Sequence, residues 1–185
     1  DLSEPLGQHL ALYLAPQSRW QLMQAKPKLR IGYGVDVHQL AEGYPLWIGG
    51  IQLPSPLGAV GHSDADVLIH AICDALLGAL ALRDIGFHFS DTDPQYKGID
   101  SKILLKEVFR LVSEKGYGIV NIDATVILET PKVNPHIEQM QLVLAGLLNL
   151  ETDEISIKAT THEKVDSFGE KRAIKAYASA LLYQL

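Results

Sequence analysis

The sequence has one cysteine and no long uninterrupted apolar run. The single thiol, Cys73, cannot form a disulfide within the chain, and its apolar surroundings predict a buried, inert side chain. Asp or His residues interrupt the longest apolar stretches well before a membrane-spanning length, and no charged and then apolar signal segment opens the chain. These absences argue against secreted and membrane-spanning proteins and predict a soluble intracellular one.

The sequence also lacks a block of basic residues to offset its formal net charge of −6. This argues against a nucleic-acid groove and against binding to an anionic membrane, so any phosphate must be bound locally. With 185 residues, 47% of them hydrophobic, the chain is long enough for one domain with a substantial core. We expect that domain at 30–185, preceded by an N-terminal extension, 1–29, to which we assign no function.

The apolar pattern predicts strands and helices in mixed order. Strands are expected at 30–37, on both sides of Gly49–Gly50, at 119–130 and at 154–160. Helices are expected at 63–78, 101–116, 134–150 and 171–184. The segment 83–98 is rich in Asp, Gly and Pro and is predicted to be a loop. An α+β fold follows: a single domain with a mixed β-sheet and helices packed on one face.

Titratable residues recur at every fourth position along the first predicted helix, at His62, Asp66, His70 and Asp74. On a helix, this spacing places them on one side of an otherwise apolar surface, which is typical of a functional site. Asp66 could instead be the acid of a capping box that starts with Ser63. Asp74 could orient a neighbouring histidine without contacting any ligand.

Asp36 and His38 lie two residues apart at the end of the first predicted strand, so their side chains share one face. Together with one of the helical histidines they offer one carboxylate and two imidazoles. That ligand set matches a Zn²⁺ site whose fourth position stays open for water or substrate. A core histidine that only donates a hydrogen bond is the simpler alternative for each imidazole.

Separate motifs follow one another from about Arg30 to the C-terminus: VDVH at 35–38, GHSDADVLIHAICDALLG at 61–78, DIGFHFSDTD at 84–93, ILETPK at 127–132 and KATTHEKVDS at 158–167. In their order and spacing, these motifs closely resemble the 2-C-methyl-D-erythritol 2,4-cyclodiphosphate synthase family. The ending THEKVDSFGEKRAI is more similar to plastid and cyanobacterial members than to enterobacterial ones.

The resemblance implies a phosphorus-oxygen lyase of the methylerythritol phosphate pathway, which makes isoprenoid precursors. Its substrate would be the nucleotide diphosphate 4-diphosphocytidyl-2-C-methyl-D-erythritol 2-phosphate, whose 2-phosphate attacks the β-phosphate and expels CMP. Because no protein nucleophile is required, catalysis must come from folding the substrate and neutralising phosphate charge. The resemblance further implies a homotrimer whose sheets face a central axis. Active sites would lie at subunit interfaces, and an isoprenoid diphosphate could occupy the axial cavity.

By the same resemblance, Asp36, His38 and His70 bind Zn²⁺, and Glu163 binds Mg²⁺ or Mn²⁺ between the phosphates of the CDP group. His62 and Thr161 match positions that contact the reacting phosphates in the family and are the expected catalytic residues. Both can donate hydrogen bonds. The expected substrate contacts are Asp36, Val37, His38, His62, Ser63, Asp84, Ile85, Gly86, Phe89, Ser90, Asp91, Thr92, Asp93, Leu128, Glu129, Thr130, Pro131, Lys132, Val133, Asn134, Thr160, Thr161, His162 and Glu163.

Within this set, residues 84–93 would hold the methylerythritol phosphate, although Asp91 and Asp93 could instead be turn formers. Residues 128–134 and 159–161 would bind the cytosine end. One departure from the family concerns the axial cavity: where many members have an arginine, this chain has Glu170, followed by Lys171 and Arg172. We therefore transfer no ligand role to Glu170.

Two other functions fit parts of the sequence. An Asp/His/His cluster beside an acidic loop would also serve a zinc phosphohydrolase that activates water. A trimeric binding protein for isoprenoid diphosphates would need the axial cavity and no chemistry. A bacterial protein of this family would be cytoplasmic, whereas a eukaryotic one would lie in the plastid stroma or apicoplast.

Overall fold

The computed structural model of the protein describes residues 28–185, so nearly all of the expected N-terminal extension lies outside the described residues. The strands are β1 (Leu29–Glu42), β2 (Leu46–Ile48), β3 (Ile51–Leu53), β4 (Leu57–Val60), β5 (Tyr117–Ile127), β6 (Ile155–Thr160) and β7 (Ala173–Gln184). The α-helices are α2 (Val67–Ala79), α3 (Ile85–His88), α4 (Ser101–Glu114), α5 (Ile137–Leu148) and α6 (Asp166–Gly169). Short 3₁₀ turns are η1 (Pro94–Tyr96), η2 (Asn134–His136) and η3 (Thr152–Glu154).

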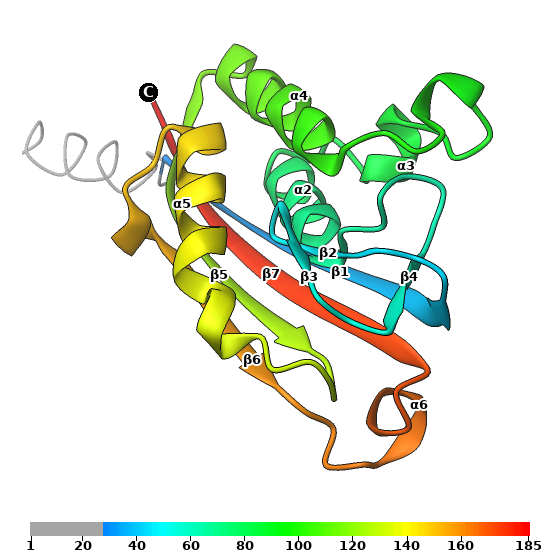
Figure 1. Ribbon diagram of the computed structural model, residues 1–185. Helices are drawn as coiled ribbons and strands as arrows, with labels where there is room; N and C mark the ends of the chain where they lie inside the picture. The colour runs from blue at the N-terminus through cyan, green and yellow to red at the C-terminus, as the bar shows by residue number, and fades with distance from the viewer. Residues whose placement is uncertain (1–27) are drawn as a thin grey trace, which may run out of the picture.

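Five strands form one mixed sheet in the order β4-β1-β7-β5-β6. Only β5 and β6 run parallel, and the other neighbours pair antiparallel. Helices α2, α4 and α5 cover one face of this sheet, as Figure 1 shows. The expected α+β class, mixed sheet and one-sided helical layer are therefore confirmed. None of the helices within 28–185 is long and apolar enough to cross a membrane.

The predicted turn at Gly49–Gly50 joins β2 and β3 as a hairpin in which Ile48 pairs with Ile51. Both glycines have positive φ, 61° and 80°, which is the conformation that a two-residue hairpin turn requires and that glycine adopts without strain. The hairpin forms a small two-stranded sheet of its own.

The prediction of a helix at 171–184 was wrong, because this segment is β7, the central strand of the sheet. Every second residue is buried, from Ile174 through three alanines to Leu182. The alanines favour a helix by propensity, and apolar residues such as Tyr177 and Leu181 on the other face hide the period of two. Pairing with β1 on one side and β5 on the other overrides that propensity.

Several expected boundaries also shift. Helix α2 begins at Val67 and not at Ser63, so His62 lies in the loop before the helix. The predicted loop at 83–98 contains α3 and η1. Strand β5 ends at Ile127, three residues before the expected end, and α5 is preceded by the 3₁₀ turn η2. Cys73 is fully buried in α2, as expected, and burial raises the pKa of its thiol.

The face of the sheet opposite the helices carries a row of exposed apolar side chains on β1. These are Leu29, Ile31, Tyr33, Val35 and Val37, with Ile31 76% and Tyr33 62% exposed. Their partners across the antiparallel ladder include Tyr177, whose ring stacks on that of Tyr33 at 6.2 Å between centroids. No described segment covers this row, so it is an apolar surface available for association.

Candidate active site

Two glycines of β1 let α2 lie directly against the strand. A Cβ added to Gly32 would lie 1.8 Å from the carbonyl oxygen of Ala75, and one added to Gly34 would lie 2.0 Å from that of Ala71. Only glycine tolerates this approach of helix to strand. Asp36 and His38 follow on the same face of β1, so their side chains meet the helix where it carries His70.

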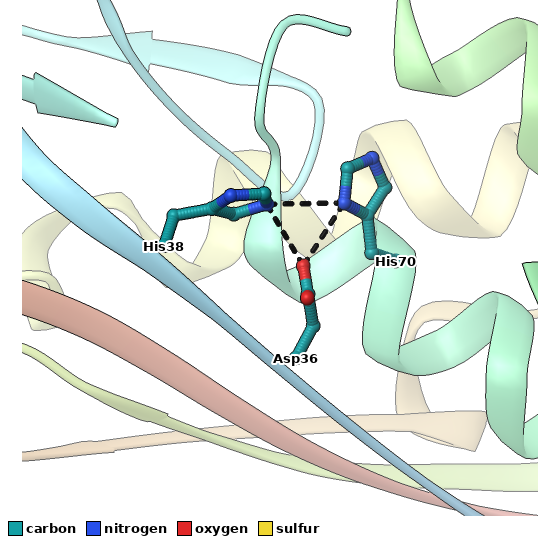
Figure 2. Close-up of side chains that lie close together, drawn as sticks. All are labelled: Asp36, His38 and His70. Carbon is teal, nitrogen blue, oxygen red and sulfur yellow. Dashed lines mark hydrogen bonds and ion pairs between the residues drawn. The ribbon is translucent and has the colours of Figure 1, made fainter. Parts of the chain in front are cut away.

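These three side chains converge on one point, as Figure 2 shows. The Oδ2 atom of Asp36 lies 2.9 Å from both His38 Nε2 and His70 Nδ1, and the two nitrogens lie 3.2 Å apart. Within 28–185 they are the one group of three such side chains close enough to share a metal ion. In a tetrahedral site with Zn–N distances of about 2.0–2.1 Å, neighbouring ligand atoms are about 3.3 Å apart, so this triangle has nearly the required size.

The far nitrogen of each imidazole also has a partner. His38 Nδ1 lies 3.1 Å from the carbonyl oxygen of Val60, which can only accept a hydrogen bond. His70 Nε2 lies 2.9 Å from Ser101 Oγ and 3.1 Å from Ser63 Oγ. Protons on these far nitrogens leave a lone pair on each near nitrogen, which is the form that binds a metal. The donor set therefore fits a divalent cation.

Within the cluster, Asp36 and His70 each shift the pKa of the other. Burial raises the pKa of Asp36, but hydrogen bonds from His38 and His70 and their charges hold it well below its usual range. Burial lowers the pKa of His70, but the hydrogen bond and charge of Asp36 outweigh burial and raise it. Both shifts favour a positive charge beside the Asp36 carboxylate.

Asp66 and Asp74, the two carboxylates in the predicted row of titratable residues, hold neighbouring segments of the fold in place. Asp66 is the N-cap of α2, and its oxygens accept hydrogen bonds from the backbone N–H groups of Ile69, Gly49 and Gly50. It thereby joins the β2–β3 turn to the helix. Asp74 accepts a hydrogen bond from Ile85 N at 2.7 Å and anchors α3. The capping interpretation of Asp66 is confirmed in a different form from the expected box, and the expectation that Asp74 orients a histidine was wrong.

A cavity of about 390 Å³ opens beside the cluster. Of the expected site residues, it is lined by Asp36, His38, His62, Ser63, His70, Ile85, Gly86, Phe89 and Asp91. His62 reaches it from the loop before α2, where its Nε2 atom lies 3.4 Å from the carbonyl oxygen of Asp93. The structure thus brings together the Asp36–His38–His70 cluster, His62 and Ser63, and four of the eight residues expected to contact the methylerythritol phosphate.

Other predicted residues of that loop have local roles. Asp84 caps α3 by accepting from Phe87 N at 2.9 Å, and Asp93 caps η1 by accepting from Gln95 N at 3.0 Å. Ser90 and Thr92 hydrogen-bond each other through their hydroxyls at 2.7 Å. For Asp93, the turn-forming alternative therefore describes the structure, whereas Asp91 lines the cavity.

Sequence reasoning missed three residues that line the same cavity, Tyr96, Ile99 and Leu104. They are apolar or aromatic residues of a loop and of α4 with no motif to single them out. It also missed Ser101, the buried first residue of α4, whose hydroxyl contacts His70. An Asp-Ser pair at a helix start reads as an ordinary cap, so only the fold reveals this contact.

The expected cytidine residues gather elsewhere, beyond the carboxyl ends of the parallel strands β5 and β6. Leu128 N donates to Thr160 O at 3.0 Å and ties the two segments together. A second cavity, of about 560 Å³, is lined by Glu129, Thr130, Lys132, Lys164, Gly169, Glu170 and Lys171. Val133 is buried in the core, so only its backbone could contact a ligand. Lys132 and Asn134 flank this buried residue, and Pro131 precedes Lys132.

Glu163 lies in the exposed loop between β6 and α6. Its Oε1 atom accepts from the Thr161 hydroxyl at 3.3 Å, while His162 Nδ1 lies 2.9 Å from Asp166 Oδ2. Neither Thr161 nor Glu163 lines the cavity that holds the Asp36 cluster. Within one chain, the Asp36–His38–His70 cluster therefore lines a different cavity from the expected cytidine residues Glu129, Thr130 and Lys132.

The model of the YgbB family matches residues 29–183. The chain belongs to the YgbB family. A protein of Porphyromonas gingivalis strain W83 named 2-C-methyl-D-erythritol 2,4-cyclodiphosphate synthase is 62% identical over 157 residues, 85% of this chain and 97% of the relative. One of the same name from Cytophaga hutchinsonii is 59% identical over 155 residues, 84% of this chain and 98% of the relative.

A solved structure of 2C-methyl-D-erythritol-2,4-cyclodiphosphate synthase in a CDP-bound form superposes with a TM-score of 0.77 at 40% identity. The match covers 83% of this chain and 99% of that one. The family expected from the motifs is therefore confirmed. The two relatives reported above are bacterial, and the expected likeness of the C-terminal segment to plastid members stays a prediction.

Proposed function

We propose that this chain converts 4-diphosphocytidyl-2-C-methyl-D-erythritol 2-phosphate into 2-C-methyl-D-erythritol 2,4-cyclodiphosphate and CMP. It is then a lyase of isoprenoid precursor biosynthesis by the methylerythritol phosphate pathway, and residues 30–185 are its catalytic domain. The observation that carries the proposal is the Asp36–His38–His70 cluster, with ligand atoms 2.9–3.2 Å apart, in a chain 62% identical to a relative of that name.

In the reaction, an oxygen of the 2-phosphate forms a bond to the β-phosphorus, and the bond from that phosphorus to the oxygen of CMP breaks. The chain has to bring the two phosphates together and bind their charge. Zn²⁺ held by Asp36, His38 and His70 would act as a Lewis acid toward a phosphate oxygen. His62 and Ser63 line the same cavity and can donate hydrogen bonds to the reacting phosphates.

A second cation, Mg²⁺ or Mn²⁺, is proposed at Glu163. A carboxylate beside a diphosphate repels it unless a cation lies between them, so Glu163 near substrate requires such an ion. Thr161, which hydrogen-bonds Glu163, would then contact the phosphates as the second catalytic residue.

The substrate's two ends would bind to different parts of the chain. The methylerythritol phosphate end would contact the 84–93 segment, of which Ile85, Gly86, Phe89 and Asp91 line the cavity beside the metal cluster. The cytidine end would contact residues 128–134 and 159–161. That a relative was solved in a CDP-bound form supports binding of a cytidine nucleotide in this fold.

A homotrimer would join these separated halves. The exposed apolar row of β1 and the stacked Tyr33–Tyr177 pair need a covering surface, and a second copy of the sheet is the simplest one. Threefold closure would place the metal cluster of one chain beside the cytidine group of the next. Lys171 could meet an isoprenoid diphosphate on the trimer axis, whereas Arg172 is paired with Glu170 at 2.7 Å.

The two alternatives make different products. A zinc phosphohydrolase would release inorganic phosphate or a linear monophosphate, and a binding protein would leave the substrate intact. We expect ³¹P NMR of the full chain with the substrate and both cations to show CMP and a cyclic diphosphate in equal amounts. Appearance of inorganic phosphate, or persistence of the substrate, would exclude the proposed function.

A further inference from the structure

The hydroxyl of Ser101 stands between a proposed metal ligand and a carboxylate that contacts no metal ligand. Ser101 Oγ lies 2.9 Å from His70 Nε2 and donates a hydrogen bond to Asp64 Oδ1. The other oxygen of Asp64 accepts from the backbone N–H of Ser101 at 2.9 Å. Ser101 is fully buried, so water does not compete for these bonds.

Only one arrangement of donors and acceptors satisfies this chain of hydrogen bonds. A serine hydroxyl has a single proton, and an ionised carboxylate can only accept. Since Ser101 donates its proton to Asp64, its oxygen must accept a hydrogen bond from His70 Nε2. The proton of a neutral His70 imidazole is then fixed on Nε2, and the lone pair of Nδ1 faces Asp36 and His38.

Ser63 is the other neighbour of His70 Nε2, at 3.1 Å, and it is less constrained. It is half-buried, lines the cavity and already accepts from Ala65 N at 3.1 Å. A hydroxyl at the cavity wall is free to rotate toward a ligand. Ser101 is therefore the partner that can hold the imidazole while Ser63 faces the substrate.

We propose that Asp64 and Ser101 are positioning residues for the metal site: they hold His70 in its Nε2-protonated form and thereby raise the affinity for the cation. The inference rests on the proposed metal cluster and adds two residues to it. Asp64 acts through Ser101, so the pair should behave as one unit. Outer hydrogen-bond partners of ligand histidines typically contribute about 10–100-fold in metal affinity.

The test measures the Zn²⁺ dissociation constant of the full chain by competition with a chromogenic chelator. Ser101→Ala should weaken binding by about 10–100-fold. Ser113→Ala is the matched control, because Ser113 lies on the same helix but donates to Phe109 O at the exposed surface, and it should leave zinc affinity unchanged. The thermal unfolding midpoint of each metal-free variant checks that it is folded.

Asp64→Asn provides a second test, and its loss of zinc affinity should be nearly as large as that of Ser101→Ala. The carboxylate of Asp64 accepts from the backbone N–H and the hydroxyl of Ser101 through two different oxygens, and an amide replaces one of these oxygens with an NH₂ donor. If the amide donates to Ser101 Oγ, the hydroxyl must point to His70 and favours the wrong tautomer. Zinc affinity should fall, and the double variant should be hardly weaker than Ser101→Ala alone.

A spectroscopic readout separates positioning from general loosening. In zinc-loaded protein labelled with ¹⁵N, the Nε2–H proton of His70 should give a slowly exchanging signal that disappears or exchanges faster in Ser101→Ala. Dissociation constants within twofold of the unaltered chain, or fully additive losses, would overturn the inference while leaving the metal site intact. Failure of the unaltered chain to bind zinc would overturn the metal site itself, and this inference with it.

Discussion

A Cβ on Gly34 would lie 2.0 Å from the carbonyl oxygen of Ala71, the residue that follows His70 on α2. The backbones of β1 and α2 are therefore in direct contact at Gly34, two residues before Asp36 on the strand and one residue after His70 on the helix. Asp36 continues the same face of β1, and its carboxylate reaches His70 Nδ1 at 2.9 Å. The absence of a side chain at Gly34 thus sets the geometry of the proposed zinc site.

Gly34→Ala should push α2 away from β1. We expect a loss of about 1–3 kcal/mol or more in the free energy of unfolding, because the obstructing atom belongs to a rigid helix backbone. Zinc affinity should fall as well, since His70 moves with the helix. Urea unfolding and chelator competition measure the two effects.

The matched control is Gly146→Ala, within α5, where an added Cβ meets no atom within 4 Å. It should stabilise the protein by about 0.5–1 kcal/mol, because alanine favours a helix over glycine. Equal effects of the two substitutions would show that close packing at Gly34 has no special importance.

His38→Ala and His70→Ala should each abolish stoichiometric zinc binding and most turnover while leaving a folded protein. Losing one ligand opens the site but removes little of the core. Metal analysis of purified protein measures the effect, with His136→Ala at the start of α5 as a control outside the cluster. Full zinc occupancy in both cluster variants would rule out the ligand assignment.

Glu163→Gln should weaken the dependence of turnover on Mg²⁺ while zinc content stays unchanged. The amide keeps the size of the side chain but loses the charge that attracts a second cation. Titrating Mg²⁺ against turnover tests this, with Glu138→Gln on the exposed side of α5 as the control. A titration curve identical to that of the unaltered chain would remove Glu163 from the site.

Active sites shared between subunits predict rescue in mixed assemblies. Chains with His70→Ala and chains with Lys132→Ala should each be inactive, because each lacks one half of the site. Unfolding and refolding them together should restore some activity, since a fraction of interfaces then combine two intact halves. Persistent inactivity in verified mixed trimers, or a monomer by light scattering, would contradict the shared site.

The residues alone predicted a cluster of one carboxylate and two histidines from short local patterns, whereas the choice of His70 came from the family resemblance. Asp36 and His38 are two apart on a strand, and His70 lies on a strongly apolar helix. The Gly49–Gly50 hairpin was predictable for the same local reason. Strand β7 was not, because its alanines favour a helix and only its position between β1 and β5 decides otherwise.

The role of Ser101 could not be read from the sequence either, because it depends on contacts across 31 and 37 positions of the chain. The same holds for Asp66, whose carboxylate contacts a turn 16 and 17 residues away. Motifs identify groups that carry chemistry, whereas the groups that hold them in place are determined by long-range packing.

The central claim is that phosphate attacks phosphate within one substrate molecule, with no part for water. Running the reaction in H₂¹⁸O and measuring the mass of each product by mass spectrometry tests this directly. We predict CMP and a cyclic diphosphate that both contain only the oxygens of the substrate. One ¹⁸O atom in CMP, or an ¹⁸O-labelled linear phosphate in place of the cyclic diphosphate, would mean hydrolysis and would contradict the proposed cyclisation.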